Sequence, residues 1–111
     1  MISSPRQNCR VSQVHQLRKH GGKWLRERRE QVGLSQRELA ERVGADHYTL
    51  ISQLETGRGR IPPERYMTWA AALDLPPQYF VQEILRFYDP VTFQILFSGN
   101  ASASAITELP E

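Results

Sequence analysis

The sequence predicts a small all-α domain, and three observations support this fold class. The chain has 111 residues, enough for one domain of ordinary size. Apolar residues recur three and four positions apart in successive segments, which is the period of an amphipathic helix. Residues that cap or end helices stand between those segments. We expect a flexible basic N-terminal tail over residues 1–22, a domain over 23–97 and a disordered tail over 98–111.

The first strong helix is expected to begin at Lys23. Apolar and long side chains stand at helical spacing in the segment KWLRERREQV, namely Trp24, Leu25, Arg28 and Val32. Gly33 follows as a C-terminal stop. Upstream, the segment SQVHQLRKH favours only a weak helix, and the pair Gly21 and Gly22 is expected to break it.

A second helix is expected over about residues 36–43. Ser35 precedes it as an N-cap, and Glu38 stands where a capping box needs a carboxylate. Gly44 supplies the conformation in which helices often end. The side chains expected to be buried are those of Leu39, Ala40 and Val43.

A third helix is expected over about residues 47–56, with Asp46 as its N-cap and Gly57 as its end. Ile51 and Leu54 are its expected core residues. This segment follows the second helix after a turn at Gly44, so the two helices are close neighbours along the chain.

Two further helices and a short extension complete the predicted fold. Pro62-Pro63 opens a fourth helix, with Pro at a first-turn position. Its inner face holds Tyr66, Trp69, Ala70 and Leu73. The segment QYFVQEILRFY forms a fifth helix that buries Phe80, Ile84 and Phe87. In DPVTFQILF, Asp89 before Pro90 indicates another helix start, although the β-branched and aromatic residues also permit a short strand.

Charge is distributed unevenly along the chain. Residues 1–60 hold 12 of the 14 Lys and Arg but 6 of the 12 Asp and Glu, so this half carries a net charge of +6, whereas residues 61–111 carry −4. A basic half suits a polyanionic partner, although a solvated surface can be uneven by chance. The basic residues of the tail form either an arm that follows DNA or a disordered surface. They are Arg6, Arg10, Arg18, Lys19 and Lys23.

Several functional classes are disfavoured. No apolar run is long enough to span a membrane, and the polar N-terminus does not resemble a secretory signal. One cysteine, Cys9, makes no internal disulfide, which favours a reducing cytoplasm. The histidines, His15, His20 and His47, lack metal-ligand spacing, and no phosphate loop or nucleophile motif occurs. We therefore expect no catalytic residues, no metal and no cofactor.

The second and third helices, joined by a turn at Gly44, are typical of a helix-turn-helix. Ala40 is small where the two helices would cross. Packing of Ile51 and Leu54 inward leaves the start of the third helix facing outward, and this end enters the major groove in such motifs. The outward positions hold side chains that form hydrogen bonds: His47, Tyr48, Thr49, Ser52 and Gln53.

These residues carry a resemblance to a known family. The segments LRERREQVGLSQRELAERVG and ISQLETGRGRIP resemble the Xre family, which shares its fold with the lambdoid phage repressors and Cro. The match covers about residues 23–88 and rests on a linked pattern of Arg29, Gly33-Leu34-Ser35-Gln36, Leu39-Ala40, Gly44, Ile51, Leu54-Glu55 and Gly57. The resemblance implies a five-helix, lambda-repressor-like DNA-binding domain whose second and third helices form the helix-turn-helix.

One departure from the family affects the register of the third helix. Gly44 and Glu55 are one residue farther apart than is usual in the family. The usual spacing would bury Gln53 and expose Leu54. An extra residue before Ile51 keeps Ile51 and Leu54 inside, so we expect the recognition helix to start later or to be extended.

The resemblance also implies roles for individual side chains. Gln36 corresponds to a phosphate-contacting position at a helix N-terminus, and Arg37 is a further phosphate candidate. Gln53 has an amide that pairs with adenine, while Tyr48 either contacts DNA or packs on the domain. Phosphate contacts are also expected for the two arginines after the third helix, Arg58 and Arg60. Arg29 and Glu55 match positions that form a structural ion pair.

The expected function is sequence-specific DNA binding in transcription regulation. We expect a repressor that binds a palindromic operator as a homodimer, with double-stranded DNA as its partner and no membrane association. The segment ILRFYDPVTFQILF is more apolar than a monomer needs, so it supplies either a dimer surface or additional core. The alternative is an antitoxin or anti-activator that uses the same fold mainly to bind a partner protein.

Overall fold

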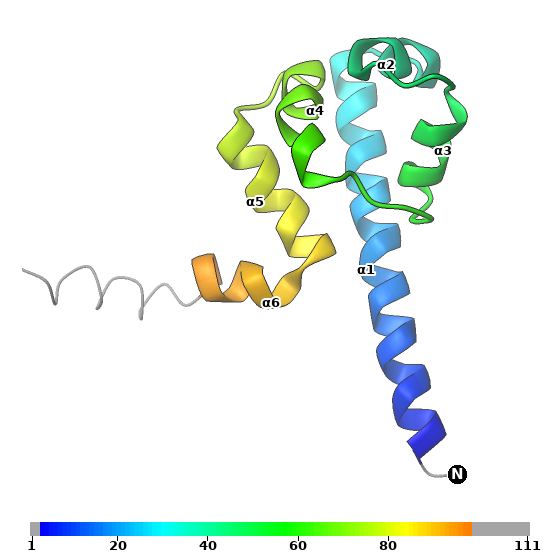
Figure 1. Cartoon of the computed structure of the whole chain (residues 1–111), viewed down its shortest axis with the longest axis vertical. Coiled ribbons are helices and arrows are strands. Elements are labelled where there is room, and N and C mark those ends of the chain that lie inside the picture. The colour runs from blue at the N-terminus through cyan, green and yellow to red at the C-terminus, as the bar shows by residue number, and fades with distance from the viewer. Residues whose placement is uncertain (1–2, 99–111) are drawn as a thin grey trace, which may run out of the picture.

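The computed structural model describes residues 3–98, and every regular element within them is a helix (Figure 1). The predicted all-α class is therefore confirmed. The elements are α1 (Ser3–Val32), α2 (Gln36–Val43), α3 (Thr49–Glu55), the short 3₁₀ turn η1 (Pro63–Arg65), α4 (Tyr66–Ala72), α5 (Pro77–Tyr88), α6 (Pro90–Phe93) and the π-helical turn η2 (Gln94–Ser98).

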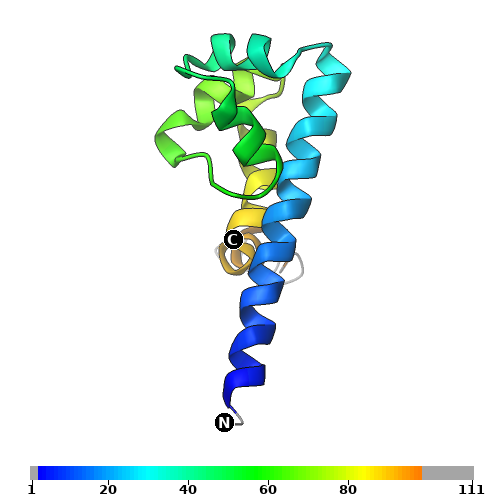
Figure 2. The ribbon, with the colours of Figure 1, turned by 90° about the vertical axis from the view of Figure 1, so that its right-hand side faces the viewer.

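The long helix α1 is the axis on which the other helices are arranged. It contacts α3 on one side and α5 on the other, while α4 packs against α2 and α5. Figures 1 and 2 show α2 lying across one end of α1, and the N-terminal half of α1 extending beyond the remaining helices. The helix-turn-helix formed by α2 and α3 therefore lies on one flank of the molecule.

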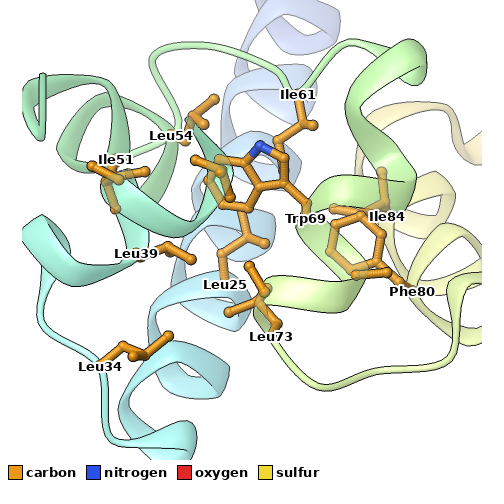
Figure 3. Packing of buried hydrophobic residues seen from close by; sticks show 14 of the residues in the cluster. Leu25, Leu34, Leu39, Ile51, Leu54, Ile61, Trp69, Leu73, Phe80 and Ile84 are labelled. Atoms are coloured by element: carbon orange, nitrogen blue, oxygen red, sulfur yellow. The ribbon is translucent and has the colours of Figure 1, made fainter. Parts of the chain in front are cut away.

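One apolar core joins all the major helices (Figure 3). Trp69 lies close to its centre, among leucines and isoleucines contributed by α1, α2, α3 and α5. Burial of each large apolar side chain stabilises the fold by about 1.5–3 kcal/mol relative to exposure. The fully buried large side chains are Leu25, Leu39, Val43, Ile51, Ile61, Leu73, Phe80 and Ile84.

The helix break predicted at Gly21 and Gly22 is wrong, because α1 continues through both glycines. Their lack of a side chain permits close packing instead. A Cβ atom on Gly22 would lie 2.3 Å from the Glu55 carbonyl oxygen, and one on Gly21 would lie 2.8 Å from the Cβ of Phe87. The glycines thus bring α1 against the end of α3 and against α5, and the helix begins well before Lys23.

The predicted ends of α2 match the structure. The Ser35 side chain accepts a hydrogen bond from the Glu38 backbone N–H, and the Glu38 carboxylate accepts one from the Ser35 N–H, which completes a capping box. The Ser35 backbone N–H and hydroxyl together lower the pKa of Glu38. Gly44 closes the helix in the left-handed region with φ 74°.

The start of α3 differs from the prediction. Asp46 is not its N-cap: the helix begins at Thr49, and Tyr48 precedes it without a side-chain capping bond. The Thr49 backbone N–H instead donates to Nδ1 of His47, 3.2 Å away. The additional residue between Gly44 and Glu55 is accommodated in this turn, so α3 is shorter than the predicted segment of about 47–56.

The segment after α5 is helical, so of the two alternatives the helix is correct. The Asp89 side chain accepts hydrogen bonds from the Thr92 N–H and hydroxyl, which caps α6 and lowers the pKa of Asp89. Ser98 ends η2. The rest of the tail predicted to be disordered, residues 99–111, lies outside the described residues.

Candidate nucleic-acid interface

The register of α3 determines which of its side chains face outward. Ile51 and Leu54 are buried, at 0% and 3% exposure, whereas Thr49 and Gln53 are exposed. Thr49 and Gln53 are four residues apart and therefore lie on the same side of the helix. The extra residue is thus placed before Ile51, as the burial of Leu54 requires.

Three side chains form a stack at the N-terminal end of α3. The rings of His47 and Tyr48 are stacked with their centroids 4.9 Å apart, and the Arg37 guanidinium lies 5.0 Å from the centre of the Tyr48 ring. The Thr49 hydroxyl lies 2.5 Å from His47 Nδ1. All four side chains remain exposed, so the stack orders this edge of the helix-turn-helix without removing it from solvent.

Leu50 is an outward residue that the sequence analysis did not select. It is 43% exposed at the first turn of α3, next to the polar positions. Ser52, which flanks Thr49 and Gln53 on the side away from Leu50, is half-buried. Leu50 precedes the buried Leu54 by four residues, a spacing that favours the same side of the helix, so the sequence pattern did not indicate its exposure.

A buried ion pair joins α1 to the end of α3. Arg29 Nε donates to Glu55 Oε2 at 2.6 Å, and a second Arg29 nitrogen donates to Oε1 at 3.2 Å. Both residues are 8% exposed, and the hydrogen bond to Glu55 raises the pKa of Arg29. Arg29 also donates to the Leu34 carbonyl at 2.7 Å, which fixes the connection between α1 and α2.

Gln36 belongs to the same network. Its amide Nε2 donates to Glu55 Oε1 at 3.1 Å, and the side chain is only partly buried. The Gln36 amide has a second N–H and a carbonyl oxygen besides this bond. The structure therefore gives Gln36 a fixed orientation at the start of α2, which the sequence analysis did not anticipate.

Three arginines, two of them in the basic half, bind the C-terminal ends of helices. Arg28 donates to the Leu73 and Asp74 carbonyls at the end of α4, and Arg42 donates to the Ala72 carbonyl. Arg65 donates to the Val43 carbonyl at the end of α2. Guanidinium groups there satisfy free carbonyls and suit the negative end of the helix dipole. The basic half thus contributes fewer free cations than its net charge suggests.

The two arginines after α3 differ in their surroundings. Arg58 is exposed beside Gly57 and lines a surface hollow with α1. Arg60 lies over the ring of Tyr88, with its guanidinium carbon 5.2 Å from the ring centre. The Tyr88 hydroxyl accepts a hydrogen bond from the Ile61 N–H, and burial raises the pKa of Tyr88. Arg60 therefore connects the loop to α5, whereas Arg58 lies over no aromatic ring of the residues that the structure describes.

The described part of the chain contains neither a candidate metal site nor a helix that could span a membrane. Among the side chains that the structure describes, those of residues 13–97, no group of three or more His, Cys, Asp or Glu is arranged to hold a metal ion. Over the same part of the chain, no helix combines the length and the apolar character that a membrane span requires.

Comparison with known proteins relates the chain to a protein family and to a bacterial protein. A family model described as helix-turn-helix matches residues 25–80, from the second half of α1 to α5. A protein of Rhodospirillum rubrum named as an uncharacterized transcriptional regulator in the ATPase CF(0) region is 36% identical over 73 residues, which cover 66% of this chain and 67% of that protein.

Proposed function

Because the chain belongs to the Xre-like helix-turn-helix family of DNA-binding transcriptional regulators, we propose that it represses transcription by occupying a palindromic operator as a homodimer. The observation that carries this proposal is the exposed face of α3, where Thr49 and Gln53 are aligned above a buried Ile51 and Leu54. In helix-turn-helix proteins this face lies in the major groove.

The side chains of α3 have the chemistry for reading bases. The Gln53 amide offers a donor and an acceptor, the arrangement that pairs with the N6 and N7 edge of adenine. The Thr49 hydroxyl reaches either a base edge or a phosphate, and Leu50 offers an apolar surface to a thymine methyl group. The ordered stack of Arg37, Tyr48 and His47 limits the flexibility of the adjoining edge.

Phosphate contacts come from both ends of the motif. At the start of α2, Gln36 is held by Glu55 and presents its remaining amide groups beside the helix N-terminus, where an anion is favoured. Arg37 is exposed next to it. Beyond α3, Arg58 is the better phosphate ligand, since stacking on Tyr88 directs Arg60 toward α5.

The homodimer is proposed to form through α5, α6 and η2. Val91, Ile95 and Leu96 are 66%, 72% and 55% exposed, and together they are termed the α6 patch. The patch adjoins a surface groove of about 490 Å³ lined mainly by apolar groups of Pro77, Val81, Leu85, Leu96 and Phe97. Exposed apolar patches of this kind are typical of interfaces, and a two-fold dimer matches an operator with two half-sites.

A partner protein is the second candidate for this surface. The same groove would accept an apolar segment of another protein, as in an antitoxin or anti-activator. An antitoxin would still bind DNA, whereas a pure anti-activator would not. The proposed location is the cytoplasm, where a transcriptional regulator reaches its DNA.

The proposal is tested by titrating labelled duplex with protein over a series of salt concentrations. Arg58→Ala should weaken binding to operator and random duplex alike and reduce the slope of log K against log salt by about 0.9, the loss expected for one phosphate contact. Arg60→Ala is the matched comparison and should change the slope less while lowering the melting temperature more. No binding to any duplex at low salt would refute the proposed function.

A further inference from the structure

Besides the exposed face of α3, a basic hollow lies between α1 and the loop that follows α3. It is a hollow of about 520 Å³ lined by His15, Arg18, Lys19, Thr56, Gly57 and Arg58. Three of these residues carry a positive charge and none carries a carboxylate. The set combines guanidinium, ammonium, imidazole and hydroxyl groups, which are the side chains that most often bind phosphate oxygens.

The backbone holds the two sides of the hollow together. Gly57 has φ +81°, and a Cβ atom there would lie 2.8 Å from the backbone nitrogen of Lys19. The loop after α3 therefore rests directly on α1. Because α1 is continuous through Gly21 and Gly22, the helix backbone that carries His15, Arg18 and Lys19 has a defined position relative to α3.

Arg18 is the most constrained member of the site. Its Nε atom is buried and has no hydrogen-bond acceptor among the described residues. Its positive charge lies close enough to Tyr88 to oppose the burial that raises the pKa of that phenol. Three cations held together repel one another, and a bound anion would relieve that repulsion.

We propose that this hollow binds a backbone phosphate of duplex DNA, at a point beyond the base pairs that α3 reads. The inference rests on the proposed function and extends it, because it assigns the part of α1 around His15 and Lys19 to the DNA interface. Thr56, Gly57 and Arg58 follow α3 directly, so the phosphate bound here belongs to the backbone that passes the C-terminal end of the recognition helix.

The test uses duplexes in which single phosphates are replaced by uncharged methylphosphonates. Binding of the full chain is measured for each substituted position, first with the native protein and then with Lys19→Gln. Lys19 is exposed, so this variant should fold normally. The native protein should lose affinity at one position flanking each half-site, and Lys19→Gln should be insensitive there. For Lys19→Gln, the slope of log K against log salt should be smaller in magnitude by about 0.9.

The control is Arg26→Gln, which removes one exposed positive charge from the C-terminal half of α1, where Arg26 pairs with Glu30 outside the hollow and outside the proposed dimer surface. It should retain the native methylphosphonate profile and salt slope. Identical profiles for the native protein and Lys19→Gln would overturn the inference while leaving DNA binding intact. Binding of inorganic phosphate by the native protein, with those profiles still identical, would also overturn it and would indicate a site for a free anion. No binding of native protein to duplex would instead refute the proposed function.

Discussion

At the residue scale, the register of α3 exposes the amide of Gln53 and buries the side chains of Ile51 and Leu54. Gln53→Ala should leave the melting temperature nearly unchanged, because an exposed amide contributes little packing. It should weaken operator binding by about 1–3 kcal/mol, the usual contribution of a bidentate base contact. Affinity for random duplex should hardly change, because that affinity comes from phosphate charges.

The same preparation supplies the control for Gln53→Ala. Its melting curve and its affinities for operator and random duplex are measured side by side with the native protein. A variant that melts earlier but keeps the native ratio of the two affinities would contradict an outward Gln53.

The buried pair of Arg29 and Glu55 should act through stability. Arg29→Ala leaves a buried carboxylate without its cation, and Glu55→Ala leaves a buried guanidinium without its anion, so each should cost about 3–5 kcal/mol of unfolding free energy. The double variant should lose less than the sum of the two single losses. Urea titrations of the four proteins give the comparison, and additive losses would show that the two side chains are not energetically coupled.

At the element scale, the packing of α1 on α3 depends on Gly22. In an isolated helix, Gly→Ala stabilises by about 1 kcal/mol. Here a Cβ atom would lie 2.3 Å from the Glu55 carbonyl oxygen, so the two helices would have to separate. Gly22→Ala should therefore destabilise the protein, by about 1–3 kcal/mol, as overpacked cores do. Thermal melting shows whether Gly22→Ala stabilises or destabilises the protein. A stabilised variant would show that α1 does not approach α3 in this way.

The elements that the sequence predicted well depend on local signals. The capping box of Ser35 and Glu38 and the left-handed Gly44 are encoded within a few residues, so the bounds of α2 were correct. The positions of Ile51 and Leu54 fixed which side of α3 is buried. These features need no knowledge of distant parts of the chain.

The elements that the sequence predicted poorly depend on contacts between distant segments. Gly21 and Gly22 indicate a helix break locally, but their partners, Phe87 and Glu55, are far along the chain. The bond from Gln36 to Glu55 and the stacking of Arg60 on Tyr88 likewise exist only in the folded molecule. Gln36 and Arg60, whose polar or charged side chains suggested phosphate contacts, therefore also take part in contacts within the fold.

At the scale of the whole molecule, the α6 patch is proposed to join two copies of the chain. Ile95→Glu places a carboxylate in the patch and should convert the dimer to a monomer, because burying an unpaired charge costs several kcal/mol. Met67→Glu is the control, since Met67 is 68% exposed on α4, outside the patch. Sedimentation equilibrium should give twice the chain mass of 12.8 kDa for the native protein and for the control.

A dimer that persists in Ile95→Glu would place the interface elsewhere. A native protein that sediments as a monomer at all concentrations, including with operator present, would remove the homodimer from the proposal and favour a partner protein at the groove. Neither result would alter the assignment of α3 to DNA.

The most direct test of the central claim, that α3 makes this protein a sequence-specific DNA-binding regulator, is the ratio of two dissociation constants. Duplexes are first selected from a random pool by binding to the native protein. Fluorescence anisotropy then compares the selected sequence with a scrambled duplex of the same length and composition at about 0.15 M salt. We predict binding to the selected sequence that is tighter by a factor of about 10³ or more. Equal affinities for the two duplexes would contradict the claim.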